Sequence, residues 1–292
     1  MNQKFRDLKN FMTWHECLSH LGLSMMCCII NNSFGHSLNN QKILMPNDYN
    51  CVGCSQDKLI IKPSFTKIEY ESPTFLECIQ GDICGLIHPL SGPFRYFMVL
   101  IDALTSWSHV CLLSTRNVAS TRLLAQIIKL KVQFPNHSIK TICLDNVGEF
   151  LSQTFLDYCV SVGIDIEYLI AHTHTQNGLA EFLMKHLQLI ARPLLLRTKL
   201  SLFALGHVIL HAATLIQISP TTNHECSPLE LALGSQPNVS HLCIFGCVVY
   251  VPITPPQRSK LGIQRRLGIY VGFNSPSIIR DLEPFTSDVF TS

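Results

Sequence analysis

The sequence predicts an α/β protein built around a mixed sheet, with a small helical region before it and a small β region after it. Three observations support this prediction. Apolar runs of strand length begin near residue 75, helical patterns alternate with strands after residue 113, and short β runs separated by Pro and Gly follow residue 240. The first 70 residues instead carry His and Cys in a helix-then-loop setting, which indicates a separate module.

The central region accounts for the mixed sheet. Strands are expected over 75–84, 94–102, 107–113, 139–145 and 164–170. Helices are expected over 118–134 with Asn117 as the cap, between Ser152 and Gly163, and from Gly178 onward. Three adjacent antiparallel strands followed by alternating helices and strands are typical of an α/β layer fold of the ribonuclease-H type, here with a mixed five-stranded sheet.

The last third of the chain predicts two more helices and then a β domain. A helix is expected over 201–218, and Ser227-Pro228 opens a short helix that Gly234 closes. The β runs after Ser240 predict a small β-barrel or a fragment of one. We therefore expect three domains, which span 1–70, 71–235 and 236–292.

Composition favours a folded protein and excludes extended disorder. Apolar residues make up 47% of the 292 residues, whereas charged residues make up 14%, below a globular norm of roughly 25%. The longest apolar stretch, Leu202–Ile218, is interrupted by His207, His211 and Gln217, so it predicts a buried helix and no membrane span. Thirteen cysteines without a signal-peptide pattern predict reduced thiols in the nucleus or cytoplasm.

Two histidines and two cysteines near the N-terminus have the spacing of zinc ligands. His15 and His20 are followed by Cys51 and Cys54, in the pattern H-x4-H-x30-C-x2-C. Zinc takes four tetrahedral nitrogen or sulfur ligands, and a Cys-x2-Cys knuckle presents two thiolates to one ion. Free thiols and ordinary histidines are the alternative interpretation. Three other cysteines could replace one of these ligands: Cys17, Cys27 and Cys28.

The spacing of the two histidines predicts where the first helix ends. Residues five apart are separated by about 140° around an ideal helix, so His15 and His20 would not share a helix face. We therefore expect His20 to lie at or beyond the helix end, with Gly22 as the C-cap.

Three acidic residues stand where the predicted fold would bring them together. Asp82 lies in the first strand, Asp145 ends the fourth, and Glu181 follows in the first turn of the long helix, with 35 residues between Asp145 and Glu181. Three carboxylates at one point repel one another unless cations neutralise them. Oxygen ligands without thiolate favour magnesium or manganese, and two such ions can flank a phosphodiester. An ordinary surface position is the alternative for any one of the three.

In combination, these motifs resemble those of a copia-type retrotransposon integrase, part of a retrovirus-related Pol polyprotein. The resemblance rests on H-x4-H-x30-C-x2-C, an Asp in the first strand, DNVGEF, QNGLAEF and the downstream RRLGIYVGF, and it covers about residues 13–285. It implies a zinc-binding pre-integrase domain, a ribonuclease-H-like catalytic core and a small Src-homology-3-like β-barrel. It further implies DNA integration by 3′-end processing and strand transfer, with zinc held by His15, His20, Cys51 and Cys54 and catalysis by Asp82, Asp145 and Glu181.

Basic residues supply candidate DNA contacts in two places. Lys185 and Arg192 follow Glu181 on the long helix, where cations could hold phosphates near the metal ions. A second cluster in the β region comprises Arg258, Lys260, Arg265 and Arg266. A solvated helix face is the alternative for the first group. The partners implied are element and target DNA and further copies of the chain in a homo-oligomer.

Departures from the family pattern open an alternative function. Val147 stands where relatives often have Gly, which is costly if that loop position needs a positive φ. Leu205 stands where relatives commonly have Trp. The alternative is a catalytically inactive, nucleic-acid-binding remnant of a Pol polyprotein. A plain nuclease of the same fold is disfavoured, because it needs neither the zinc module nor the barrel.

Overall fold

The computed structural model describes residues 11–36, 51, 54, 73–85, 93–145, 147–150, 152–168, 177–198, 200, 204–221, 224–253, 258, 262–284, 286 and 288–292. They fall into two compact units. The first unit draws on Met1–Asp57, Leu189–Glu230 and Ser235–Ser292. The second draws on Lys58–Gln188 and Leu231–Gly234.

A mixed five-stranded sheet forms the second unit, in the order β3-β2-β1-β4-β5. Its strands are β1 (Cys78–Cys84), β2 (Tyr96–Asp102), β3 (Ser108–Leu113), β4 (Thr141–Leu144) and β5 (Asp165–Tyr168). β1 and β3 pair antiparallel with β2, whereas β4 is parallel to β1 and to β5. The predicted mixed sheet with helices is thereby confirmed, with each strand within about three residues of its expected bounds.

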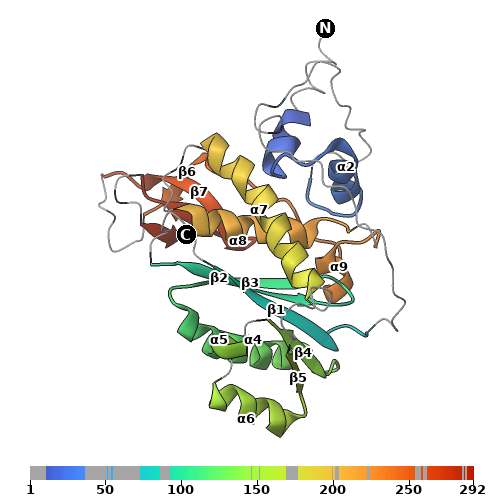
Figure 1. The fold of residues 1–292 in the computed structure, drawn as a ribbon. Coiled ribbons are helices and arrows are strands. Elements are labelled where there is room, and N and C mark those ends of the chain that lie inside the picture. The colour runs from blue at the N-terminus through green and yellow to red at the C-terminus, as the bar shows by residue number, and fades with distance from the viewer. Residues whose placement is uncertain are drawn as a thin grey trace. The chain divides into compact units, whose positions relative to one another are not determined.

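One face of this sheet carries the main apolar core. Ile79 and Ile83 of β1 and Ile142 and Leu144 of β4 are buried there. They pack with side chains of α4 (Ala119–Gln133) and α6 (Gln153–Val162), and Figure 1 shows α4 lying along the sheet. Because alternate strand residues point to opposite faces, Gln80 and Asp82 lie on the other face. The polar side chains of β1 are therefore separated from this core.

Of the three helix-end residues predicted in this unit, Ser152 and Gly163 are confirmed. Ser152 is the N-cap of α6, and its hydroxyl accepts a hydrogen bond from the Phe155 backbone N–H at 3.3 Å. Gly163 ends the same helix in the left-handed conformation, with φ of 71°. The predicted Asn117 cap was wrong: Asn117 lies inside the short 3-10 turn η1 (Arg116–Val118), which precedes α4.

The first unit contains helices and a separate antiparallel sheet. Its sheet has the order β6-β7-β8-β9, formed by β6 (Val248–Pro252), β7 (Arg265–Ser275), β8 (Ile278–Leu282) and β9 (Val289–Thr291). Its helices include α2 (Leu23–Asn31), α8 (Leu205–Ile218) and part of α9 (Pro228–Leu233). α8 packs against β7 and buries nine of its residues, as its apolar sequence predicts.

The longest helix, α7 (Gly178–Thr198), contributes residues to both units. It continues through Pro193, although a proline inside a helix removes one backbone hydrogen bond. A short helix, α5 (Val147–Phe150), follows β4. Among the described residues, no helix combines the length and the apolar character needed to cross a membrane.

Candidate functional site

The chain brings His15 and His20 together through a left-handed turn. Residues 11–17 are helical, and the turn that follows places Ser19 at φ of 55° and His20 at φ of 64°. The His20 backbone N–H donates to the His15 carbonyl oxygen at 2.6 Å. His20 therefore lies beyond the helix end, as expected. The predicted Gly22 C-cap was wrong, because Gly22 is the N-cap of α2 with φ of −66°.

Four side chains, His15, His20, Cys51 and Cys54, form what we call the His/Cys cluster. Their ligand atoms all lie within 4.8 Å of one another. His15 Nε2 lies 3.2 Å from His20 Nδ1 and 3.4 Å from Cys54 Sγ, and His20 Nδ1 lies 3.1 Å from Cys51 Sγ. The edges of a tetrahedral zinc site with nitrogen and sulfur ligands measure about 3.3–3.8 Å. The cluster therefore has the chemistry and nearly the dimensions needed to bind zinc.

A hydrogen bond outside the cluster orients one of its ligands. His15 Nδ1 lies 2.9 Å from the Leu21 carbonyl oxygen, which can only accept a hydrogen bond. Nδ1 must therefore carry the proton, and the lone pair of Nε2 points into the cluster. Backbone carbonyls commonly fix metal-binding histidines in this way. Both rings are buried, with His15 4% and His20 3% exposed.

The neighbouring cysteines that could have replaced the predicted ligands lie outside this group. Among the described residues, the His/Cys cluster is the one group of three or more potential ligands gathered within 4.8 Å. Burial raises the pKa of Cys17 to about 12, which disfavours the thiolate that zinc requires. Cys28 is exposed on α2.

The first two members of the predicted catalytic trio lie at the same end of adjacent strands. Gly81 of β1 is opposite Leu144 of β4 in the parallel register, so Asp82 and Asp145 follow at the next position of each strand. Asp82 is 5% exposed, and its Oδ1 accepts a hydrogen bond from the Ile83 backbone N–H at 2.7 Å. Asp145 is half-buried just past the end of β4. Strand pairing therefore gives these two aspartates neighbouring backbone positions.

Contacts between α7 and β1 position the third member. The Asn177 amide donates to the Gly81 carbonyl oxygen at 3.4 Å, and the Leu179 backbone N–H donates to the Gln80 side chain at 3.2 Å. These contacts fix the N-terminus of α7 beside the strand that carries Asp82. Glu181 lies in the first turn of that helix, and its backbone N–H donates to the Asn177 carbonyl oxygen.

Asp82, Asp145 and Glu181, which we call the carboxylate trio, are gathered less tightly than the His/Cys cluster. They do not form a group of ligand atoms within 4.8 Å, although all three belong to the part of the chain that the structure describes. Glu181 also pairs with Lys185, with 3.6 Å between the charged atoms. Mutual repulsion of carboxylates without a cation accounts for such a spread.

The predicted DNA contacts lie in different settings. Lys185 and Arg192 are exposed on α7, and Arg265 is exposed at the start of β7. Arg258 is exposed, and its Nε donates to the Ile253 carbonyl oxygen. Lys260 lies outside the described residues.

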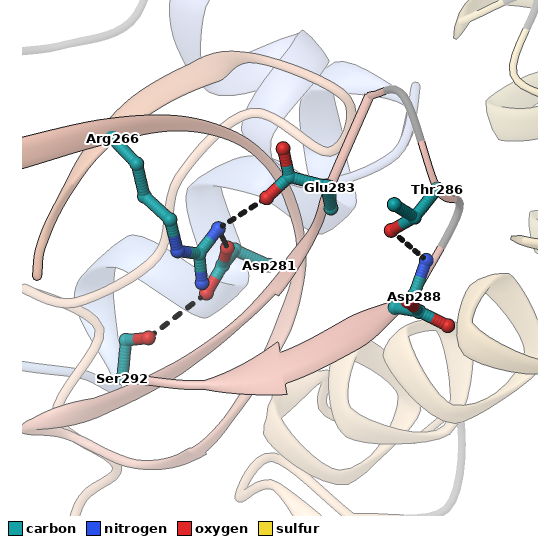
Figure 2. Close-up of polar contacts among 6 residues, drawn as sticks. All are labelled: Arg266, Asp281, Glu283, Thr286, Asp288 and Ser292. Atoms are coloured by element: carbon teal, nitrogen blue, oxygen red, sulfur yellow. Dashed lines mark hydrogen bonds and ion pairs between the residues drawn. The ribbon is translucent and has the colours of Figure 1, made fainter. Parts of the chain in front are cut away.

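Arg266 is engaged by two carboxylates, as Figure 2 shows. Its Nη1 lies 2.5 Å from Oδ2 of Asp281 and 3.5 Å from Oε2 of Glu283. Asp281 is fully buried, and the Ser292 hydroxyl donates to its Oδ1 at 3.0 Å. A buried carboxylate needs such compensation. Arg266 therefore neutralises carboxylates of the sheet, so it is less available to contact a DNA phosphate.

The structure also supplies one positioning residue, Gln80, that the sequence alone did not identify. Gln80 anchors the start of α7, and the side-chain amide of the buried Asn177 anchors it to the same strand. Alternation along β1 puts Gln80 on the same face as Asp82, and this was the available signal. The backbone at Val147 is helical, so the cost expected from a positive φ there does not arise.

Comparisons with known proteins agree with the motifs. The chain is 26% identical over 262 residues to the retrovirus-related Pol polyprotein from transposon TNT 1-94 of Nicotiana tabacum, covering 89% of this chain and 19% of that protein. It is also 26% identical over 265 residues to that from transposon RE2 of Arabidopsis thaliana, covering 90% and 18%. The predicted resemblance to a retrotransposon Pol polyprotein is confirmed. The chain spans less than a fifth of these Pol polyproteins.

Two further comparisons add little. No protein-family model matches the chain. A solved structure, a simian T-cell lymphotropic virus intasome in complex with the PP2A regulatory subunit B56 gamma, aligns over 82% of this chain and 84% of that chain. The identity is 14% and the TM-score is 0.47, which is too low to establish a shared fold.

Proposed function

We propose that this chain is the integrase region of a copia-type retrotransposon Pol polyprotein. Its reaction would be metal-dependent polynucleotidyl transfer, in which 3′-end processing of element DNA precedes strand transfer into target DNA. The observation that carries the proposal is the parallel register that gives Asp82 and Asp145 neighbouring positions on adjacent strands. The anchored start of α7, whose first turn carries Glu181, supports the assignment of Glu181 as the third member. The order of three antiparallel and two parallel strands supports a ribonuclease-H-like core.

The carboxylate trio would hold two divalent ions, magnesium or manganese. When bound, these ions activate the attacking oxygen and stabilise the leaving oxygen of a phosphodiester. Asp82 and Asp145 would ligate them from the strand ends, and Glu181 would complete one site from α7. Lys185, now paired with Glu181 at 3.6 Å, stands close enough to the trio to hold a DNA phosphate once cations occupy it.

The rest of the chain would support DNA binding. The His/Cys cluster would hold a structural zinc ion that fixes the predicted 1–70 domain, because zinc binding and folding are coupled in small modules. The antiparallel sheet β6–β9 would belong to the Src-homology-3-like barrel of the predicted 236–292 domain. Arg192, Arg258 and Arg265 would contact DNA backbone, and several copies of the chain would act together on two DNA ends.

An oligonucleotide joining assay tests this proposal. The purified chain should process and join a duplex that mimics an element end, and only with magnesium or manganese present. Asp145→Asn should abolish both steps and leave DNA binding nearly unchanged, because Asn keeps the shape but removes a charge that holds the metal ion. The matched control is Asp157→Asn, an exposed carboxylate on α6 whose loss should leave joining intact.

Two outcomes would contradict the proposal. If the parent chain binds DNA in a salt-sensitive manner but neither cuts nor joins it, the chain is an inactive remnant. If the Asp145→Asn variant joins DNA as well as the parent does, the carboxylate trio is not the active site.

A further inference from the structure

Two thiols approach each other on neighbouring strands of the five-stranded sheet, and neither belongs to the His/Cys cluster or the carboxylate trio. Cys78 is the first residue of β1 and Cys143 lies in β4, with 3.8 Å between their sulfur atoms. Gln80 is directly opposite Cys143 in the parallel register. Cys78 therefore lies two residues from the opposite position and points to the same face of the sheet.

The two sulfur atoms have different surroundings. Cys78 is half-buried, whereas Cys143 is 5% exposed. Cys143 has a single S–H hydrogen and two acceptors in reach, the Cys78 sulfur and Oε2 of Glu167 at 3.3 Å. A hydrogen bond from Cys143 lowers the pKa of the Cys78 thiol. The more accessible sulfur is therefore the one favoured as the reactive thiolate.

We propose that Cys78 and Cys143 form an oxidation site, at which a hydroperoxide closes a reversible disulfide between β1 and β4. The Cys78 thiolate attacks the peroxide, the O–O bond breaks, and Cys78 becomes a sulfenic acid. The Cys143 sulfur then attacks the Cys78 sulfur, so that an S–S bond forms and the S–O bond breaks. Together the two thiols lose two hydrogens, and hydrogen peroxide is reduced to two waters.

The required movement falls at a strand end. A disulfide bond measures about 2.05 Å, so the sulfur atoms must approach each other by about 1.8 Å. Diagonal positions on paired strands have Cα atoms about 7–8 Å apart, beyond the usual disulfide span of about 4.4–6.8 Å, so the backbone at Cys78 must also move toward β4. Cys78 directly follows the turn in which the Glu77 backbone N–H donates to the Thr74 carbonyl oxygen. The bond would tie together the strands that precede Asp82 and Asp145. Any effect on catalysis rests on the proposed function, whereas formation of the bond does not.

Peptide mapping of the full, zinc-loaded chain tests the proposal. The chain is treated with hydrogen peroxide, its remaining thiols are alkylated, and it is digested with trypsin and then with a protease that cuts before Asp. Cleavage before Asp82 separates Cys78 from Cys84, and cleavage before Asp145 separates Cys143 from Cys159. We expect a Cys78–Cys143 peptide that lacks two hydrogens, together with loss of alkylation at both residues and its return after dithiothreitol.

Variants distinguish this pair from general oxidation. Cys78→Ser should remove the cross-linked peptide and leave Cys143 fully alkylated. The matched control is Cys84→Ser, a half-buried cysteine on the same face of β1, which should leave the cross-link unchanged. Oxidation of Cys78 to sulfinic acid without a cross-link, or cross-linking to another cysteine instead, would overturn the proposal. Because the decisive mapping uses the unmodified chain and no DNA, it is independent of whether the chain joins DNA.

Discussion

The His/Cys cluster and the carboxylate trio differ in how closely their ligand atoms are gathered. The cluster has its four ligand atoms within 4.8 Å, because a left-handed turn and a hydrogen bond from His15 to Leu21 fix the rings. The trio has its backbone positions fixed by strand register and by the start of α7, yet its oxygens are not gathered to the same degree.

The charge of the ligands explains this difference. Imidazole and thiol groups can approach one another as hydrogen-bonding groups, so their ligand atoms can lie close together in the folded chain. Carboxylates that share one site repel one another, so a cation between them favours their approach. The comparison teaches that the first site is suited to a resident structural ion, and that the second is suited to ions that arrive with the substrate.

The largest effect should come from breaking the His/Cys cluster. Cys51→Ser removes one of four zinc ligands, and structural zinc commonly contributes on the order of 10 kcal/mol of apparent binding free energy to folding. We expect bound zinc to fall from about one ion per chain to near zero, with loss of amide protection over residues 11–31. Metal analysis and hydrogen exchange measure this. Cys28→Ser, an exposed cysteine on α2, is the control and should keep its zinc.

The opposite behaviour is expected of the carboxylate trio. Asp82→Asn should leave the metal-free chain as stable as the parent or slightly more stable, because one of three repelling charges is gone. It should abolish stabilisation by magnesium, which for the parent is about 2.7 kcal/mol at a magnesium concentration 100 times the Kd. Thermal unfolding with and without magnesium measures both effects. A metal-free Asp82→Asn chain that unfolds as readily as Cys51→Ser would contradict the comparison.

Two histidines outside the His/Cys cluster, His207 and His211, should make the stability of the chain depend on pH. Burial lowers the pKa of His211 to about 3 and that of His207 to about 4, and the nearby Arg280 guanidinium adds to both shifts. Below about pH 6.5 the unfolded chain therefore binds more protons than the folded chain, so the free energy of unfolding falls as the pH falls below this value. Above about pH 6.5 the two histidines do not reduce it. At pH 5 each histidine should lower the free energy of unfolding by about 2 kcal/mol.

Substitution of His211 tests this pH dependence. His211 is fully buried and packs against Phe245 and Tyr270. Between pH 7 and pH 5, His211→Phe should therefore lose less of its free energy of unfolding than the parent does. The exposed His137 is the control, and His137→Gln should retain the pH dependence of the parent. Equal pH dependence in the parent and His211→Phe would contradict the assignment. Unfolding by denaturant at the two pH values measures the difference.

The smallest effect on stability is expected at Lys185. Its pair with Glu181 is an exposed i,i+4 contact, which contributes about 0.3–0.5 kcal/mol at most. Lys185→Ala should therefore leave the unfolding midpoint nearly unchanged but weaken DNA binding and reduce its salt dependence. Lys129→Ala on the distant helix α4 is the control. A DNA affinity unchanged by Lys185→Ala would place the DNA elsewhere.

The sequence predicted most elements because their signals are local. Apolar runs of strand length located β1 to β5, and Ser152 and Gly163 marked the ends of α6. Asn117 misled because the chain makes a 3-10 turn there, and Gly22 misled because its φ is negative. The spacing of the histidines indicated that the helix ends before His20, but the left-handed turn itself depends on unusual φ values. Alternation gave the face of β1 on which Gln80 lies, but its bond to Leu179 joins segments distant in sequence.

Anomalous X-ray diffraction tests the difference between the His/Cys cluster and the carboxylate trio most directly. Data are collected from crystals grown without added metal, before and after manganese is added. We predict a zinc peak between His15, His20, Cys51 and Cys54 in both data sets. We predict a manganese peak between Asp82 and Asp145 only after manganese is added, with Glu181 drawn toward it. A His/Cys cluster without zinc, or manganese bound away from both aspartates, would contradict the account.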